Sequence, residues 1–240
     1  MFRGGIVRQI SRIVPLSLSF TDNKVGGYGM NFETKYLIRW GIPGWMLIFW
    51  ITTFFVLTEF ENIFSHFNFS DFGKLVGVFI SLGVFGIVLG YIVHQLYFVV
   101  NWVTDKARMF ENVIKEIDNF PKPDNWGGNN RVDYFYLEFI WHKNLLELEE
   151  EKRNYIVGRY RYLLSTVHGL GTLFLSHFLS FVFTIAAGLL KFGNLTLEVD
   201  FLAIAQGGIM FVILASFKYY SENLNYFQGR VLNAMLKDEI

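Results

Sequence analysis

Charged residues are absent from four long windows of the chain. Residues 75–104 and 162–190 form windows of 30 and 29 residues without Lys, Arg, Asp or Glu, and residues 40–58 and 201–217 form windows of 19 and 17. A helix that crosses the roughly 30 Å hydrocarbon layer of a bilayer needs about 20 apolar residues at 1.5 Å each. The pattern therefore predicts four transmembrane helices, at 36–60, 74–103, 161–190 and 200–220, with loops at 61–73 and 191–199.

The positions of Lys and Arg predict how these spans are oriented. Residues 1–39 hold six of them, residues 105–161 hold ten and residues 218–240 hold three, whereas the two remaining connections hold only Lys74 and Lys191. Cytoplasmic segments close to span ends carry the positive excess. We therefore expect both termini and residues 104–160 in the cytoplasm, and the two short loops outside.

Residues 104–160 are predicted to form an antiparallel hairpin of two cytoplasmic helices that extend spans 2 and 3. An apolar stripe at helical spacing ends at Pro121 and Pro123, and the sequence DNWGGNN that follows is typical of a loop. Asp133 is a plausible N-cap for a second stripe, which leads into the third span. The expected fold class is thus an all-α polytopic membrane protein with the hairpin tip at 121–131.

Both ends of the chain show amphipathic patterns. In segment 1–35, Phe2, Ile6, Ile10 and Ile13 share one helical face and the arginines lie off it, as in a helix that lies in the headgroup layer. Organelle targeting is the alternative interpretation of this basic composition. Residues 221–240 predict a second amphipathic helix, which we expect to contact the hairpin or another subunit.

Polar residues inside the spans are costly in hydrocarbon and need partners. We interpret them first as interhelical hydrogen bonds and alternatively as the lining of a water-filled inner vestibule. Glycines at Gly86-x-x-x-Gly90 predict a close helix contact on the second span. The candidate pore or polar membrane-face residues are His94, Tyr97, Asn101, His168, Thr172 and Gln206.

The hairpin and the C-terminal helix carry more aromatic and apolar residues than a two-helix seam requires. Surplus apolar surface of this kind usually contacts another subunit, lipid headgroups or a partner protein. The candidate partner or oligomer surface consists of Tyr134, Phe135, Trp141, Leu224, Phe227 and Val231.

Composition excludes several classes of function. Only 18% of the residues are charged, against about 25% in an average soluble domain, and 52% are hydrophobic. The absence of cysteine excludes disulfides, thiolate zinc sites, iron–sulfur clusters and a cysteine nucleophile. Because 21 basic residues balance 21 acidic ones, no net field attracts nucleic acid, and we expect no nucleic-acid partner.

Candidate catalytic patterns are sparse. Arg161 and His168 have a spacing that resembles the nuclease motif of HEPN domains, but Tyr162 stands where that family generally has a polar residue. Glu138 and His142 lie one helical turn apart, yet no second such pair completes a metal site. There is no Walker loop, dinucleotide fingerprint or nucleophile elbow. We expect no catalytic residues, cofactor or metal.

The sequence therefore predicts a non-enzymatic integral membrane protein that acts as a homo-oligomeric pore or channel, or as a subunit of a transport-related membrane complex. The plasma membrane is the expected location, with an inner organelle membrane as the alternative. A second hypothesis is an accessory or scaffold subunit that docks a partner through its aromatic hairpin. A third is an intramembrane or membrane-anchored enzyme.

Overall fold

The computed structural model describes residues 32–60, 72–103 and 110–240, and these residues form helices and connecting turns without a strand. The expectations for residues 1–31, including the amphipathic N-terminal helix, and for loop residues 61–71 lie outside the described part. The helices are α2 (Phe32–Thr58), α4 (Phe72–Phe98), a π-helical turn η2 (Val99–Val103), α5 (Phe110–Lys115), α6 (Asn130–Glu147), α7 (Glu150–Phe192) and α8 (Leu197–Leu236).

Four of these helices are long and apolar enough to cross a membrane. Each contains an apolar window of membrane-spanning length, within Trp40–Thr58, Val76–Asn101, Glu150–Phe192 and Leu197–Leu236, so the number of predicted spans agrees with the structure. Large apolar side chains also face outward, since Ile80 is 65% exposed and Phe211 is 75% exposed. A water-soluble domain rarely exposes so many contiguous apolar side chains, so this surface is compatible with a multi-pass membrane protein.

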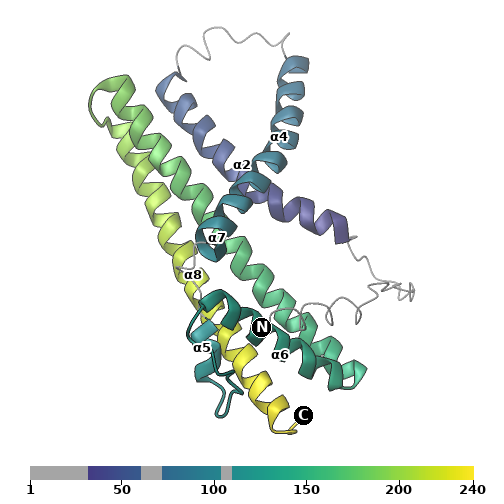
Figure 1. Ribbon diagram of the computed structural model, residues 1–240. Coiled ribbons are helices and arrows are strands. Elements are labelled where there is room, and N and C mark those ends of the chain that lie inside the picture. The colour runs from purple at the N-terminus through teal and green to yellow at the C-terminus, as the bar shows by residue number, and fades with distance from the viewer. Residues whose placement is uncertain (1–31, 61–71, 104–109) are drawn as a thin grey trace, which may run out of the picture. The chain divides into compact units, whose positions relative to one another are not determined.

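Helices α2 and α4 cross at glycines (Figure 1). A Cβ atom at Gly44 would overlap the carbonyl oxygen of Gly86, and one at Gly90 would overlap the carbonyl oxygen of Trp40. Trp45 donates a hydrogen bond from Nε1 to the Gly83 carbonyl at 2.8 Å. The close contact predicted for Gly86-x-x-x-Gly90 is therefore confirmed, with α2 as the partner helix.

Helices α7 and α8 form a long antiparallel pair (Figure 1). Gly193 ends α7 in the left-handed conformation at φ 71°, where glycine avoids the strain of a side chain. Helix α2 packs against this pair through Trp50 and Phe54, which are buried with Val199 and Leu202 of α8. The fourth span and the predicted C-terminal helix are one unbroken helix.

The final turns of α8 pack with α5, α6 and the start of α7 around one apolar core. We call residues 110–160 together with 221–236 the α5–α6 module. Its buried core consists of Phe110, Val113, Ile117, Phe120, Leu137, Ile140, Trp141, Leu145, Ile156, Leu232 and Met235. Gly229 lies where α5 approaches α8 most closely, because a Cβ there would stand 2.7 Å from the Val113 carbonyl oxygen. Of the two contacts expected for the C-terminal helix, the structure therefore shows the one with residues 104–160.

The apolar stripe predicted to lead from Tyr134 into the third span is divided between two helices. Helix α6 ends at Glu147, its C-cap Leu148 is extended at φ −80° and ψ 151°, and α7 begins anew at Glu150. A continuous helix would place Glu147 one turn from Glu150 and Glu151, and like charges at this spacing repel. The break instead places Glu150 and Glu151 in the first turn of α7, where the helix dipole favours negative charge.

The start of α6 also differs from the prediction. Asn129, not Asp133, is the N-cap, and its Oδ1 accepts hydrogen bonds from the backbone N–H groups of Arg131 and Val132 at 3.0 and 3.3 Å. Asp133 is buried in the first turn and accepts a 2.9 Å hydrogen bond from the backbone N–H of Gly127, which has φ 88°. The acidic side chain therefore closes the preceding loop onto the helix.

Candidate functional site

A cluster of polar side chains lies between α4 and α7 inside the apolar stretches. His94 Nδ1 of α4 stands 3.0 Å from the hydroxyl of Thr172 on α7, and that hydroxyl donates to the backbone carbonyl of His168 at 2.8 Å. The ring of His168 lies 6.3 Å from that of His94 and 5.9 Å from that of Tyr97, edge to face in both cases. We call His94, Tyr97, His168 and Thr172 the histidine cluster.

Tyr97 fits into this cluster because α7 has a glycine opposite it. The tyrosine is 4% exposed, and a Cβ at Gly171 would overlap its ring. Asn101 of η2, four residues further along the chain, donates to the Tyr97 carbonyl at 3.1 Å. Four of the six candidate membrane-face residues thus form one cluster, with Asn101 adjacent to it.

Gln206 belongs to a different polar group. Its side chain is fully buried and donates to the hydroxyl of Thr184 at 3.1 Å, which joins α8 to α7. Further along α7, Ser176 donates to the carbonyl of Pro43 in α2. Ser176 was not among the candidates, because a serine in an apolar span does not show in the sequence which neighbouring helix it contacts.

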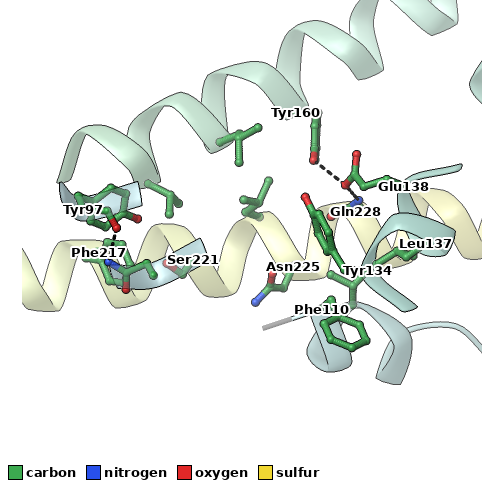
Figure 2. A pocket seen from close by; sticks show the side chains of 15 residues that line it. Tyr97, Phe110, Tyr134, Leu137, Glu138, Tyr160, Phe217, Ser221, Asn225 and Gln228 are labelled. Carbon is green, nitrogen blue, oxygen red and sulfur yellow. Dashed lines mark hydrogen bonds between the residues drawn. The ribbon is translucent and has the colours of Figure 1, made fainter. Parts of the chain in front are cut away.

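A cavity adjoins the histidine cluster at the end that faces the α5–α6 module. It measures ≈ 100 Å³ and is lined by residues of α4, α5, α6, α7 and α8 together with Asn101 of η2. Tyr97 and Asn101 line it at the span end, and Glu138, Tyr160 and Gln228 line it at the other end (Figure 2). The cavity therefore runs along the groove between α7 and α8, from the spans into the module.

The cavity wall combines apolar side chains with polar groups, and Glu138 is the charged residue among those that line it. The carboxylate accepts hydrogen bonds from the Tyr160 hydroxyl at 3.3 Å and from the Gln228 amide at 3.5 Å (Figure 2). Tyr160 precedes the uncharged stretch of α7, and burial together with the Glu138 charge raises its pKa. The phenol therefore stays protonated and remains a donor to the carboxylate.

Ser221 contributes a second polar atom to the wall. The residue is 5% exposed, and its buried hydroxyl has no hydrogen-bond partner among the described residues. A serine inside a helix commonly donates to the carbonyl four residues earlier, which here would be that of Phe217. Ser221 does not make this bond, so its hydroxyl is available to a molecule in the cavity.

The sequence did not identify Glu138, Tyr160, Gln228 or Ser221 as members of one site. They come from α6, α7 and α8, and Gln228 lies 90 residues after Glu138 in the chain. The usable signal was the position of Glu138 on the apolar stripe of α6, one residue after Leu137 and three before Trp141. A carboxylate at a core-facing position needs hydrogen-bond donors from other elements.

The candidate partner surface is largely covered by the chain itself. Trp141 is completely buried within the chain and Leu224 is 8% exposed. Tyr134, Phe227 and Val231 are partly buried and pack against the core of the module. The physical reason is that α8 returns to fill the space beside α6. Phe135 alone of the six is open to solvent, at 60% exposure.

Phe135 belongs to an exposed apolar stripe on α6. Val132, Phe139 and Leu146 are also exposed, and Leu146 reaches 74%. With His142, these residues follow the spacing of three and four that places side chains on one face of a helix. We call Val132, Phe135, Phe139 and Leu146 the α6 stripe.

The remaining chemical candidates do not assemble into a metal site. Arg161 lies exposed on α7, and the Glu138 carboxylate stands 3.6 Å from His142 Nε2. Across the residues that the structure describes, no group of three or more His, Asp or Glu side chains could hold a metal ion. Comparison of the chain with known protein families, with curated proteins and with solved structures finds no match.

Proposed function

We propose that this protein is a non-enzymatic integral membrane protein that acts in transport, as a homo-oligomeric pore or channel or as a subunit of a transport-related complex. The Lys and Arg distribution supports an orientation with both termini and residues 104–160 in the cytoplasm. The histidine cluster then lies toward the cytoplasmic ends of the spans. The proposed location is the plasma membrane.

The observation that carries the proposal is the continuity between the histidine cluster and the cavity. Polar and ionisable side chains within membrane spans are rare and frequently mark the path of a substrate or ion. Here Tyr97 belongs to the cluster and also lines the cavity, with Asn101 beside it. Polar groups therefore line the cavity from its end inside the spans to Glu138 in the module, which suits the inner half of a path.

Flux through reconstituted liposomes tests this proposal. We expect purified protein to raise ion or small-solute flux above that of empty liposomes, and His168→Ala to change that flux at least severalfold. The matched control is His142→Ala, because His142 is exposed on α6 and lies outside the spans. Flux that remains at the level of empty liposomes for several ions and solutes would contradict the proposal.

An accessory role is the second candidate, and the α6 stripe favours it. The spacing of these residues fits an apolar helix laid along α6, as in helix-in-groove recognition and coiled coils. In this version the protein docks a helical segment of a partner subunit and needs no conduction path.

The mass of the detergent-solubilised native particle distinguishes the two candidates. A whole-number multiple of the chain mass favours the homo-oligomer, and a mixed particle favours the accessory role. If the particle is mixed, Phe135→Ser combined with Phe139→Ser should release the partner. Replacement of the exposed Glu151 of α7 by serine should not release it. Retention of the partner by the double variant would count against docking on the α6 stripe.

A further inference from the structure

The cavity between α7 and α8 combines apolar walls with one charged group. Among the described residues that line it, Glu138 is charged, and no lysine, arginine or histidine faces it. A carboxylate without a cation in the same wall attracts positive charge and repels anions. Fatty acids and phosphates are therefore disfavoured as occupants.

Aromatic rings frame the space in front of this carboxylate. Tyr134 projects between α7 and α8, and Tyr160 stands across from it with its hydroxyl on Glu138 (Figure 2). The faces of aromatic rings attract organic cations. Oε1 of Glu138 accepts from both protein donors, and Oε2 lies 3.6 Å from Nε2 of the exposed His142. Because a carboxylate offers about four acceptor positions, Glu138 still has room for a ligand N–H group.

The unpartnered hydroxyl of Ser221 is an independent sign that the cavity takes an occupant. The residue lies two turns before Gln228 on α8, so the two polar positions are separated by roughly 10 Å at 1.5 Å per residue. A buried polar atom without a hydrogen bond costs free energy. A ligand or a water molecule held beside it would remove that cost.

The volume limits the size of the occupant. One water molecule requires about 10–15 Å³, so a cavity of ≈ 100 Å³ has room for several water-sized groups and suits a small organic molecule. We propose that the cavity binds a small lipophilic ammonium ion, with its nitrogen at Glu138 between Tyr134 and Tyr160 and its apolar part along the α7–α8 groove toward Ser221. This goes beyond the transport proposal, since binding is expected whether or not the protein conducts.

Calorimetric titration of the full chain in detergent tests the proposal. The probe is phenethylammonium, with the neutral 2-phenylethanol as a control of equal size. Glu138→Gln keeps an acceptor for Tyr160 and Gln228 but removes the charge, so it should fold and should bind the cation at least tenfold more weakly. Glu147→Gln removes the same charge from the exposed end of α6 and should bind like the wild type. Because the variants share one detergent, the heat of partition into micelles cancels.

A variant that fills the cavity tests whether the cation binds there. Ser221→Leu should abolish binding while thermal unfolding confirms that the protein remains folded. Three results would each overturn the proposal: equal affinity for the cation and the alcohol, the same isotherm for wild type and Glu138→Gln, or wild-type affinity in folded Ser221→Leu.

Discussion

Gly44 brings two spans into backbone contact. Because its missing side chain lets α2 reach the Gly86 carbonyl, even one methyl group must push the helices apart. We expect Gly44→Ala to lower the free energy of unfolding by about 1–3 kcal/mol, as overpacking does. Gly77→Ala on α4 has no atom within 4 Å of the new carbon and should leave that free energy unchanged or slightly higher. Unfolding in mixed micelles measures both, and equal effects would contradict the assignment of the crossing point.

Thr172 connects α4 to α7 through His94, so its hydroxyl can be tested alone. Thr172→Val keeps the shape and removes the 3.0 Å contact with His94 Nδ1. Hydrogen bonds between membrane helices contribute about 0.6 kcal/mol on average and up to about 1.7 kcal/mol, and we expect a loss in this range. Thr166→Val is the control, because that hydroxyl donates to the Tyr162 carbonyl of its own helix. A loss no greater than that of the control would show that His94 gains nothing from Thr172.

Among the elements, the contact between α5 and α8 reverses an expectation from helix propensity. In an isolated helix, Gly229→Ala would stabilise by about 1 kcal/mol. In the folded chain the new carbon would lie 2.5 Å from Glu116 Cβ, so we expect a net loss of about 1–3 kcal/mol. Gly158→Ala on α7 meets no neighbour and should follow propensity. Thermal unfolding of both variants reports the signs, and stabilisation by Gly229→Ala would refute this packing.

The end of α8 is held to the segment after α5 by charges. Lys237 Nζ lies 2.5 Å from Asp118 Oδ2, and this contact lowers the pKa of Asp118 and raises that of Lys237. The stabilisation is therefore fully present between the ordinary pKa values of 3.8 and 10.5, and it declines as the pH falls below the first or rises above the second. We expect Asp118→Asn to lower the melting temperature at pH 7, and the difference from wild type to shrink toward zero below the folded pKa of Asp118. A difference that persists unchanged in acid would contradict this linkage.

The presence of a helix or of a close helix contact could be predicted from the sequence where a local pattern of residues is sufficient. The four apolar helices follow from charge-free windows, and the glycine contact follows from spacing. The break after α6 was not predicted, because Leu145, Leu148 and Tyr155 continue the apolar stripe across it. The spacing of apolar residues carries no information about repulsion between neighbouring glutamates. The sequence places Trp141 on an apolar face that must be covered, but it does not show that the same chain covers it. The cavity depends on side chains from five helices, and no single stretch of sequence contains that information.

For the whole molecule, the proposed topology gives a direct prediction. The chain contains no cysteine, so single cysteines can be labelled without background. In sealed cells, a membrane-impermeant maleimide should label Asn194→Cys in the second loop, and Asp124→Cys should react only after permeabilisation. The reason is the concentration of Lys and Arg in residues 105–161, which favours the cytoplasmic side. The opposite labelling pattern would show that the protein has the reverse orientation and would contradict the proposed topology.

The continuity of α7 and α8 has a mechanical consequence. Their 43 and 40 residues run unbroken, so each helix extends roughly 60 Å at 1.5 Å per residue. Gln206 in the membrane-spanning part and Gln228 at the cavity therefore belong to the same continuous helix, α8. Thr184 and Tyr160 are connected in the same way by α7. If either helix tilts within the bilayer, the part of the cavity wall that it carries, Tyr160 on α7 or Gln228 on α8, should move with it relative to Glu138. A molecule bound in the cavity between the two helices should resist that movement.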